Sequence, residues 1–309
     1  MRKMKKGLYI GLCIAGLVFC GCGKKEESPA PKLEEYSNYD SVREKEIFIE
    51  DENLKTPKAM VCVGDSLYVV NKDGNSVLQY SKDGSLQNTI KGFWSPIAIA
   101  HFEKEIYVAN ENDGKIHAMD EEGNLLKEYY VEPLNQVNLS VLDMEADADY
   151  IYLSVVADNE EALSVYRVRK EDGQIGKIGK SCMGALCRDS KNQIYFVQTY
   201  EFFEENGYTG FGSGKSSLYR IVDGSMQEIA KLPASYTPMD MVEYGDKFYI
   251  YSSGLAQIDV LDMQGNYEKT VLEEIADSSN SGLGYMAADD EGNIYLSDTE
   301  KNFVYKLKQ

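Results

Sequence analysis

The chain is short of histidine, tryptophan and positive charge. It has two histidines and one tryptophan in 309 residues, and its 51 acidic side chains outnumber its 32 basic ones, for a formal net charge of −19. Such a surface repels phosphate backbones and anionic headgroups, which excludes nucleic-acid binding. His101 and His117 cannot supply three imidazole ligands to zinc, so a three-histidine zinc site is excluded too.

No long apolar run is available to cross a bilayer as a helix. The apolar segment 7–19 has thirteen residues, whereas a transmembrane helix needs about 20. It follows a basic N-terminus and precedes Gly21-Cys22, a combination that resembles a bacterial lipobox. The sequence therefore predicts a lipoprotein signal peptide over residues 1–21 and a lipid on Cys22, with the protein anchored at the extracytoplasmic face of the cell membrane. A plain secretory signal is the alternative.

A polar segment follows the lipobox. Residues 22–43 hold Pro29, Pro31 and many charges, with no apolar periodicity. This composition is typical of a flexible linker. We expect a tether over 22–43 and one folded domain over 44–309, which is long enough for a large single β domain.

The folded part contains a repeated strand motif. Six times, a short apolar strand built around a tyrosine recurs at intervals of about 40 to 55 residues. Another strand follows each of them, commonly ending in an acidic or Asp-Gly turn of the kind that tight hairpins need. This period predicts an all-β fold, a six-bladed β-propeller with four strands in each blade. The tyrosine strands begin at Leu67, Ile106, Ile151, Ile194, Phe248 and Ile294.

The two ends of the folded part each hold an incomplete unit. The sixth repeat stops at its third strand, 304–307, while a lone strand, 44–50, precedes the first repeat. Pairing these two segments would leave no open sheet edge. The sequence predicts that the N-terminal strand closes the last blade.

Two of the repeats resemble NHL repeats. The residues that carry the resemblance lie in 94–110 and 284–298, and the weaker likeness covers about 45–309. The resemblance implies a six-bladed propeller used mainly for binding, and in some relatives for metal-assisted lyase or lactonase chemistry. Regucalcin and gluconolactonase relatives hold a divalent ion at the centre of the ring with Glu, Asn and Asp. The acidic residues near the inner strands match no such spacing: Asp143, Glu145, Asp240 and Glu243.

Aromatic residues gather in segments expected on one face of the propeller. Loops between second and third strands emerge beside loops between blades, and the longest of them, 200–215, is rich in aromatics. Exposed aromatic rings offer large contact area at low entropic cost. The sequence predicts a binding or scaffold module for a protein, peptide or glycan. The candidate contacts are Phe93, Trp94, Tyr200, Tyr208, Phe211, Tyr236 and Tyr285, with His101 added because it ends an inner strand.

The alternative is a divalent-metal-dependent hydrolase or lyase, lactonase-like, at the central channel. No catalytic residue, metal ligand or cofactor is assigned from the sequence, apart from weak Ca²⁺ binding by loop carboxylates and amides. Hairpin turn chemistry explains the same loop residues more simply. They are Asp73, Asn75, Asn110, Asn112 and Asp113.

The domain also holds three cysteines. Cys182 and Cys187 are candidates for a disulfide in an extracytoplasmic compartment. The other interpretation, which also suits Cys62, is that of a small buried apolar residue.

Overall fold

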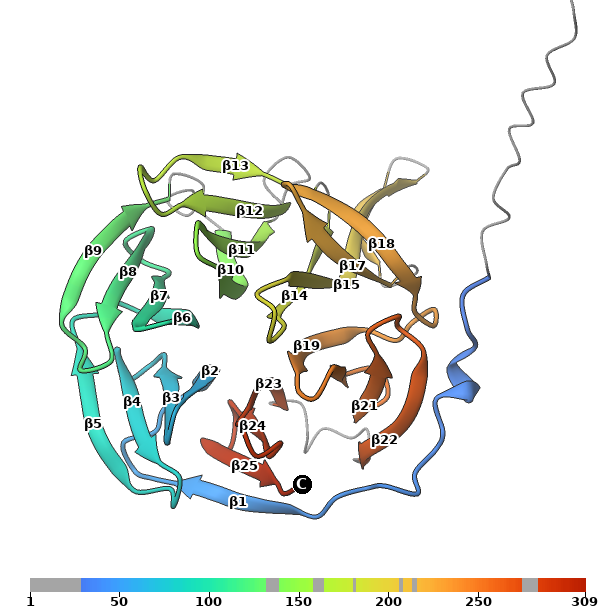
Figure 1. Cartoon of the computed structure of the whole chain (residues 1–309), viewed down its shortest axis with the longest axis horizontal. Helices are drawn as coiled ribbons and strands as arrows, with labels where there is room; N and C mark the ends of the chain where they lie inside the picture. Colours follow the sequence, from blue (N-terminus) through green and yellow to red (C-terminus); the bar gives the residue numbers. More distant parts are fainter. Residues whose placement is uncertain are drawn as a thin grey trace, which may run out of the picture.

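The computed structural model describes residues 29–131, 139–157, 164–179, 182–205, 208–212, 216–273 and 283–309. Six antiparallel sheets, five of four strands and one of five, surround a central channel (Figure 1). The predicted all-β, six-bladed β-propeller is confirmed. Among these residues no helix is long and apolar enough to span a membrane. The predicted signal peptide and Cys22 lie outside the described residues.

The first three blades follow one another in sequence, each running from an inner to an outer strand. Blade 1 consists of β2 (Pro57–Val63), β3 (Ser66–Asn71), β4 (Ser76–Ser81) and β5 (Leu86–Lys91). Blade 2 consists of β6 (Pro96–Phe102), β7 (Glu105–Asn110), β8 (Lys115–Asp120) and β9 (Leu125–Tyr130). Blade 3 consists of β10 (Leu139–Ala146), β11 (Tyr150–Ala157), β12 (Ser164–Arg169) and β13 (Ile175–Lys177).

Blade 4 carries one extra strand, and blade 6 borrows its outer strand from the N-terminal region. Blade 4 consists of β14 (Cys182–Arg188), β15 (Ile194–Glu205), β17 (Ser217–Val222) and β18 (Ser225–Lys231), with β16 (Tyr208–Gly212) on the extension of β15. Blade 5 consists of β19 (Pro238–Glu243), β20 (Lys247–Ser252), β21 (Gln257–Asp262) and β22 (Tyr267–Glu273). Blade 6 consists of β23 (Leu283–Ala288), β24 (Ile294–Asp298), β25 (Phe303–Leu307) and β1 (Lys45–Glu50).

Strand β1 closes the ring. It pairs with β25 in antiparallel register, from Lys45 opposite Leu307 to Glu50 opposite Phe303. The inner strands of neighbouring blades pack together, and β23 of blade 6 packs against β2 of blade 1. The predicted closure of the last blade by the N-terminal strand is confirmed.

The repeated tyrosine has a structural explanation. Each tyrosine strand lies second in its blade with neighbouring blades on both faces, so its residues are buried on both sides. A buried tyrosine needs a partner for its hydroxyl. In three blades an aspartate in the turn between the first and second strands accepts that hydrogen bond. These pairs are Tyr152 with Asp147 at 2.7 Å, Tyr195 with Asp189 at 3.2 Å and Tyr295 with Asp289 at 3.0 Å.

The segment from η1 (Leu33–Glu35) to residue 43 differs from the predicted flexible tether. Tyr36 is only 3% exposed, because its ring stacks on Tyr267 and packs edge-on against Tyr236. The Asn38 carbonyl accepts a hydrogen bond of 2.8 Å from the Thr270 N–H of β22. Residues 33–43 therefore form a strap along the outer edge of blade 5.

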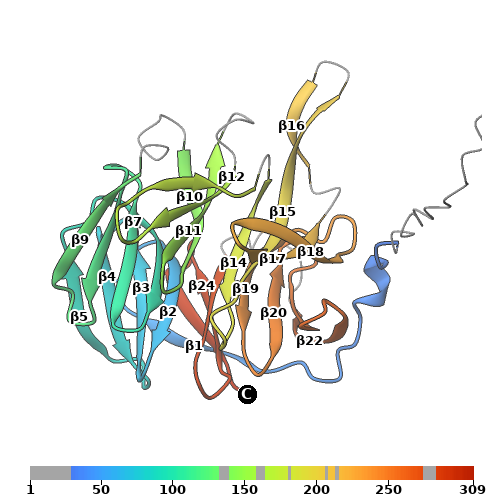
Figure 2. The same ribbon diagram turned by 45° about the horizontal axis from the view of Figure 1, so that its top comes forward.

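The two faces of the propeller differ. We call the face at which the inner strands begin the upper face, and the one at which they end the lower face. The extended hairpin of β15 and β16 projects from the upper face (Figure 2). That position agrees with the expected placement of the insertion 200–215.

Candidate functional site

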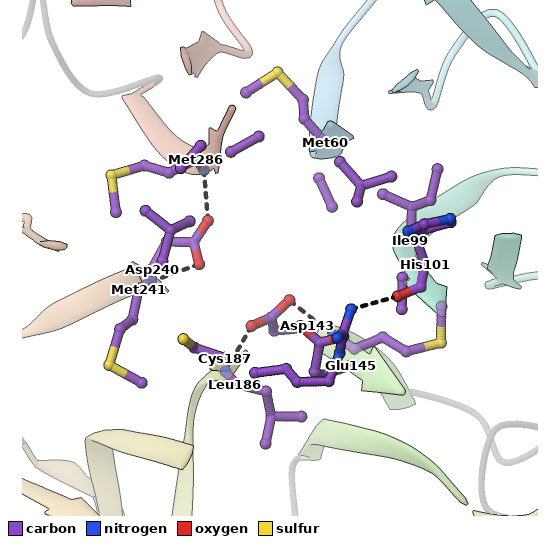
Figure 3. Close-up of a pocket in the computed structure, with 18 of the residues that line it drawn as sticks. Met60, Ile99, His101, Asp143, Glu145, Leu186, Cys187, Asp240, Met241 and Met286 are labelled. Carbon is purple, nitrogen blue, oxygen red and sulfur yellow. Dashed lines mark hydrogen bonds and ion pairs between the residues drawn. The ribbon is translucent and has the colours of Figure 1, made fainter. Parts of the chain in front are cut away.

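The inner strands enclose a cavity of about 180 Å³ on the propeller axis. All six inner strands contribute to its wall (Figure 3). Because pockets with convergent polar groups are where small molecules bind, this cavity is the first candidate for a site.

The cavity wall has two chemically different halves. Blades 1, 2 and 6 contribute mainly alanine, methionine and other apolar side chains, including Met60, Ile99 and Met286. Blades 3 to 5 contribute the charged residues. In Figure 3, Asp143 and Asp240 lie on one side of the open centre, and Met60 and Ile99 lie across from them. The charged residues in the wall are Asp143, Glu145, Arg188, Asp240 and Glu243.

Asp143 bridges blades 3 and 4. Its Oδ2 accepts a hydrogen bond of 2.6 Å from the Leu186 N–H, and its Oδ1 accepts one of 2.8 Å from the Met144 N–H. Burial, with a smaller contribution from the nearby Glu145 carboxylate, raises the pKa of Asp143 to about 7. The carboxyl group of Asp143 is thus buried in the cavity wall. Its protonation changes near neutral pH.

Asp240 bridges blades 5 and 6 in the same way. Its Oδ2 accepts a hydrogen bond of 2.5 Å from the Met286 N–H, and its Oδ1 accepts one of 2.7 Å from the Met241 N–H. Burial, and next the charge of Asp143, raise the pKa of Asp240 well above its ordinary value. The two carboxyl groups therefore sense each other, and Asp240 keeps its proton more readily than a solvated carboxyl does.

The lower end of the cavity is held by Arg188. Its Nη2 donates a hydrogen bond of 2.9 Å to the His101 carbonyl, and its Nε lies 3.5 Å from Glu145 Oε1. Burial is the largest cause that lowers the pKa of His101. The imidazole Nε2 of His101 is buried and lies 3.9 Å from Glu121 Oε1. His101 thus borders the cavity, as expected.

The backbone holds both carboxyl groups of the cavity wall. Each oxygen of Asp143 and of Asp240 accepts one backbone N–H group and keeps a second lone pair for another partner. Within the described residues, no group of three or more His, Cys, Asp or Glu side chains is arranged to hold a metal. Turn bonds likewise involve the loop residues predicted for weak Ca²⁺ binding, such as Asp73, which accepts from the Thr56 hydroxyl at 2.6 Å.

The predicted aromatic contacts have different surroundings. Trp94 is 63% exposed on the upper face, whereas Phe93 packs tilted against the His117 ring. Tyr236 is completely buried, and its hydroxyl donates a hydrogen bond of 2.7 Å to Asp259. Tyr236 therefore belongs to the core beneath the strap and presents no surface to a ligand in this structure.

The other predicted contacts lie in β15, β16 and β23. Tyr200 is half-buried and pairs with Met183, while Tyr285 is half-buried under the Lys58 ammonium group. Tyr208 and Phe211 stand in β16, and their side chains lie outside the described residues. The structure thus brings Trp94 and Tyr285 to the upper face, but it does not join the full aromatic set into one patch.

The cysteines behave as apolar residues. Cys182 and Cys187 are both buried in β14, five positions apart. A strand rises about 3.3 Å per residue, which separates them by about 16 Å, far beyond the reach of a disulfide. Burial also raises the pKa of the Cys187 thiol well above its ordinary value. The disulfide candidate is therefore excluded in this conformation.

Comparison with known proteins identifies the architecture alone. No family model and no curated protein matches the chain, so membership of the NHL family is not confirmed. Among solved structures, the chain resembles a gluconolactonase from Xanthomonas campestris, with a TM-score of 0.60, 14% identity and coverage of 91% of this chain and 98% of that chain. It also resembles regucalcin, a calcium-binding protein from Agrobacterium tumefaciens, with a TM-score of 0.61, 11% identity and coverage of 86% and 93%.

A third similar structure is virginiamycin B lyase from Staphylococcus aureus. Its TM-score is 0.55 at 14% identity, with coverage of 86% of this chain and 98% of that chain. At such identities the shared property is the six-bladed propeller, and activity does not transfer with the fold.

Proposed function

We propose that this propeller is a hydrolase or lyase that acts on a small lactone- or ester-like molecule in the central cavity. The observation that carries the proposal is a carboxyl group, Asp143, that borders the cavity with a pKa of about 7. A general acid or base works best when its pKa lies near the working pH. The similarity to a gluconolactonase and a lyase supports the same reading.

Asp143 and Asp240 divide the acid and base roles. Ionised Asp143 accepts a proton from the attacking water, while Asp240, whose pKa burial and the charge of Asp143 raise, serves in its protonated form as the donor to the leaving oxygen. In lactone hydrolysis, the water oxygen bonds to the carbonyl carbon and the ring C–O bond breaks. Proton exchange between the two carboxyl groups and solvent then restores the starting state. This scheme uses the two carboxyl groups alone.

A substrate panel tests this function. Domain 29–309 is assayed with δ-lactones, γ-lactones and aryl esters, with and without EDTA, alongside Asp143→Asn. We expect turnover that persists in EDTA and a loss of about 100-fold or more in Asp143→Asn. A panel with no turnover in the wild type, or equal rates in both proteins, would reject the proposal.

A second candidate function is binding through the upper face. Trp94, the one tryptophan of the chain, is 63% exposed, and exposed tryptophans are frequent anchors in interfaces. This property makes Trp94 fluorescence a direct reporter for a titration with glycans and peptides. A saturable blue shift would support a protein, peptide or glycan ligand, and constant emission across the panel would count against it.

We further propose that the protein is tethered to the extracytoplasmic face of the cell membrane by a lipid on Cys22. The proposal is supported by the apolar segment 7–19 and the Gly21-Cys22 pair. Labelled palmitate should be incorporated into the full chain and not into Cys22→Ser. Label in both proteins, or in neither, would overturn it.

A further inference from the structure

The upper rim of the cavity holds a cation for which the described part of the chain supplies no anionic partner. Lys58 is the second residue of β2 and immediately precedes Ala59 in the cavity wall. Its Nζ lies 5.3 Å from the centre of the Tyr285 ring. Among the described residues, no carboxylate lies within ion-pair distance of Lys58. This is unusual in a chain with a net charge of −19.

The neighbouring cation is already neutralised. Lys72 Nζ lies 2.8 Å from Glu111 Oε2, and the same carboxylate accepts hydrogen bonds from Ser95 at 3.0 Å and Ser140 at 3.1 Å. Glu111 is therefore fully committed to its neighbours and is not a free partner for Lys58. Asp73 is the other carboxylate that influences Lys58, and it accepts the Thr56 hydroxyl.

Tyr285, whose ring lies beside Lys58, adds a second donor. Its hydroxyl has no hydrogen-bond partner in the described part of the chain. Burial, and next the charges of Asp240 and Asp143, raise the pKa of Tyr285, so this hydroxyl stays protonated and able to donate. Burial, and next the charge of Lys72, lower the pKa of Lys58, and an anion beside Lys58 would offset the repulsion between the two ammonium groups.

We propose that Lys58 and Tyr285 form a subsite for the carboxylate of a small anionic ligand at the upper rim of the cavity. Two donors match the two oxygens of a carboxylate. A dianion such as phosphate would gain too few contacts against the repulsion of a strongly acidic protein. The inference rests on the proposed function for the reacting end of the ligand, because a carboxylate held here would point the rest of the molecule toward Asp143 and Asp240.

The subsite defines a substrate class for the enzyme. A carboxylate-bearing lactone or ester would have its anionic end at Lys58 and its carbonyl in the carboxyl half of the cavity. The wall opposite, with Met60 and Ile99, would accept the apolar part of the molecule. A neutral analogue lacks the charge that Lys58 would bind.

Binding is tested separately from turnover. The probes are 2-hydroxybutyrate and its neutral methyl ester, titrated calorimetrically into domain 29–309. The variants are Lys58→Met, Tyr285→Phe and the control Lys55→Met, which removes the same charge from an exposed position in the same segment. Far-ultraviolet circular dichroism and thermal unfolding establish that each variant is folded.

We expect the anion to bind wild type and Lys55→Met equally, with the ester binding at least tenfold more weakly. Affinity for the anion should fall about tenfold or more in Lys58→Met and a few-fold in Tyr285→Phe. Equal affinity in Lys58→Met and Lys55→Met, or equal binding of ester and anion, would overturn the subsite. Anion binding that depends on Lys58 without any lactone turnover would keep the subsite and reject the enzyme. Turnover of carboxylate-bearing lactones that is unchanged in Lys58→Met would keep the enzyme and reject the subsite.

Discussion

Four inner strands of the cavity wall, those of blades 1, 2, 3 and 5, share one backbone design and differ at one position. Blades 3 and 5 have Asp143 and Asp240 there, each immediately before a methionine. Blades 1 and 2 have Ala59 and Ala98 in the same place, before Met60 and Ile99. Since the fold forms with alanine in two blades, the propeller itself does not demand an acid. The difference indicates that Asp143 and Asp240 have a role beyond forming the fold, either in joining particular blades or in acting on a ligand.

The largest effect is expected from removing an acid. Asp240→Ala leaves the N–H groups of Met241 and Met286 without their acceptor in a buried place. Each such loss costs about 1 to 3 kcal/mol, so we expect about 3 kcal/mol less stability in urea unfolding. Asp240→Asn keeps one acceptor oxygen and should lose less. If Asp240→Ala unfolded at the same urea concentration as wild type, the prediction that Asp240 stabilises the contact between blades 5 and 6 would be wrong.

Adding an acid to the apolar half tests the comparison from the other side. In Ala98→Asp, the new carboxyl group meets a Met144 N–H that is already bound to Asp143. A buried carboxyl without adequate donors costs about 2 kcal/mol in mutational data. Urea unfolding of Ala98→Asp beside Ala98→Asn measures this loss. An unchanged midpoint would mean that every blade can accept an acid at this position.

The pH dependence of stability should come from the acid half. The folded-state pKa of Asp143 is about 7, above the value of about 3.9 for an unfolded aspartate. The folded protein therefore binds more protons between these values, and the contribution is fully present below about pH 4 and is lost as the pH rises through 7. We expect a loss of about 2.5 kcal/mol between pH 5 and 8, measured by urea unfolding. Asp143→Asn should flatten this dependence, and a persistent slope would assign it to other groups.

The smallest effect is expected from repacking the apolar half. Met286→Leu keeps side-chain volume in the wall and leaves the Met286 N–H free to bind Asp240. Such swaps usually cost under about 1.5 kcal/mol. The urea midpoint should move little and the pH profile should keep its shape. A change in the pH profile would mean that the two halves are coupled.

The sequence predicted the ring more fully than the site. The spacing of the tyrosine strands and the lone strand before Leu67 were sufficient for six blades and their closure, because both depend on local pattern. Asp143 and Asp240 were visible as acids near inner strands. Their pairing with Leu186 and Met286 was not, because each bond crosses from one blade to the next.

Two further differences between the predicted and the observed structure also come from contacts that are distant in sequence. Tyr236 was expected at the upper face because it lies between blades, but its hydroxyl binds Asp259 inside blade 5. Tyr36 lies in a charged segment without apolar periodicity, so nothing local indicates that it enters a cluster with Tyr236 and Tyr267. Both positions are decided by contacts between segments far apart in the chain.

The pairing of β1 with β25 has a consequence for the order of folding. Lys45 meets Leu307 across almost the whole domain, so the last blade cannot be completed until both ends of the folded part are present. Contacts of such long sequence separation form slowly. Until they form, β25 has an open edge that invites pairing with another chain. Before β1 pairs with β25, the newly made protein is thus prone to aggregation through this edge. A chaperone that covers the edge of β25 during this time would protect the whole ring.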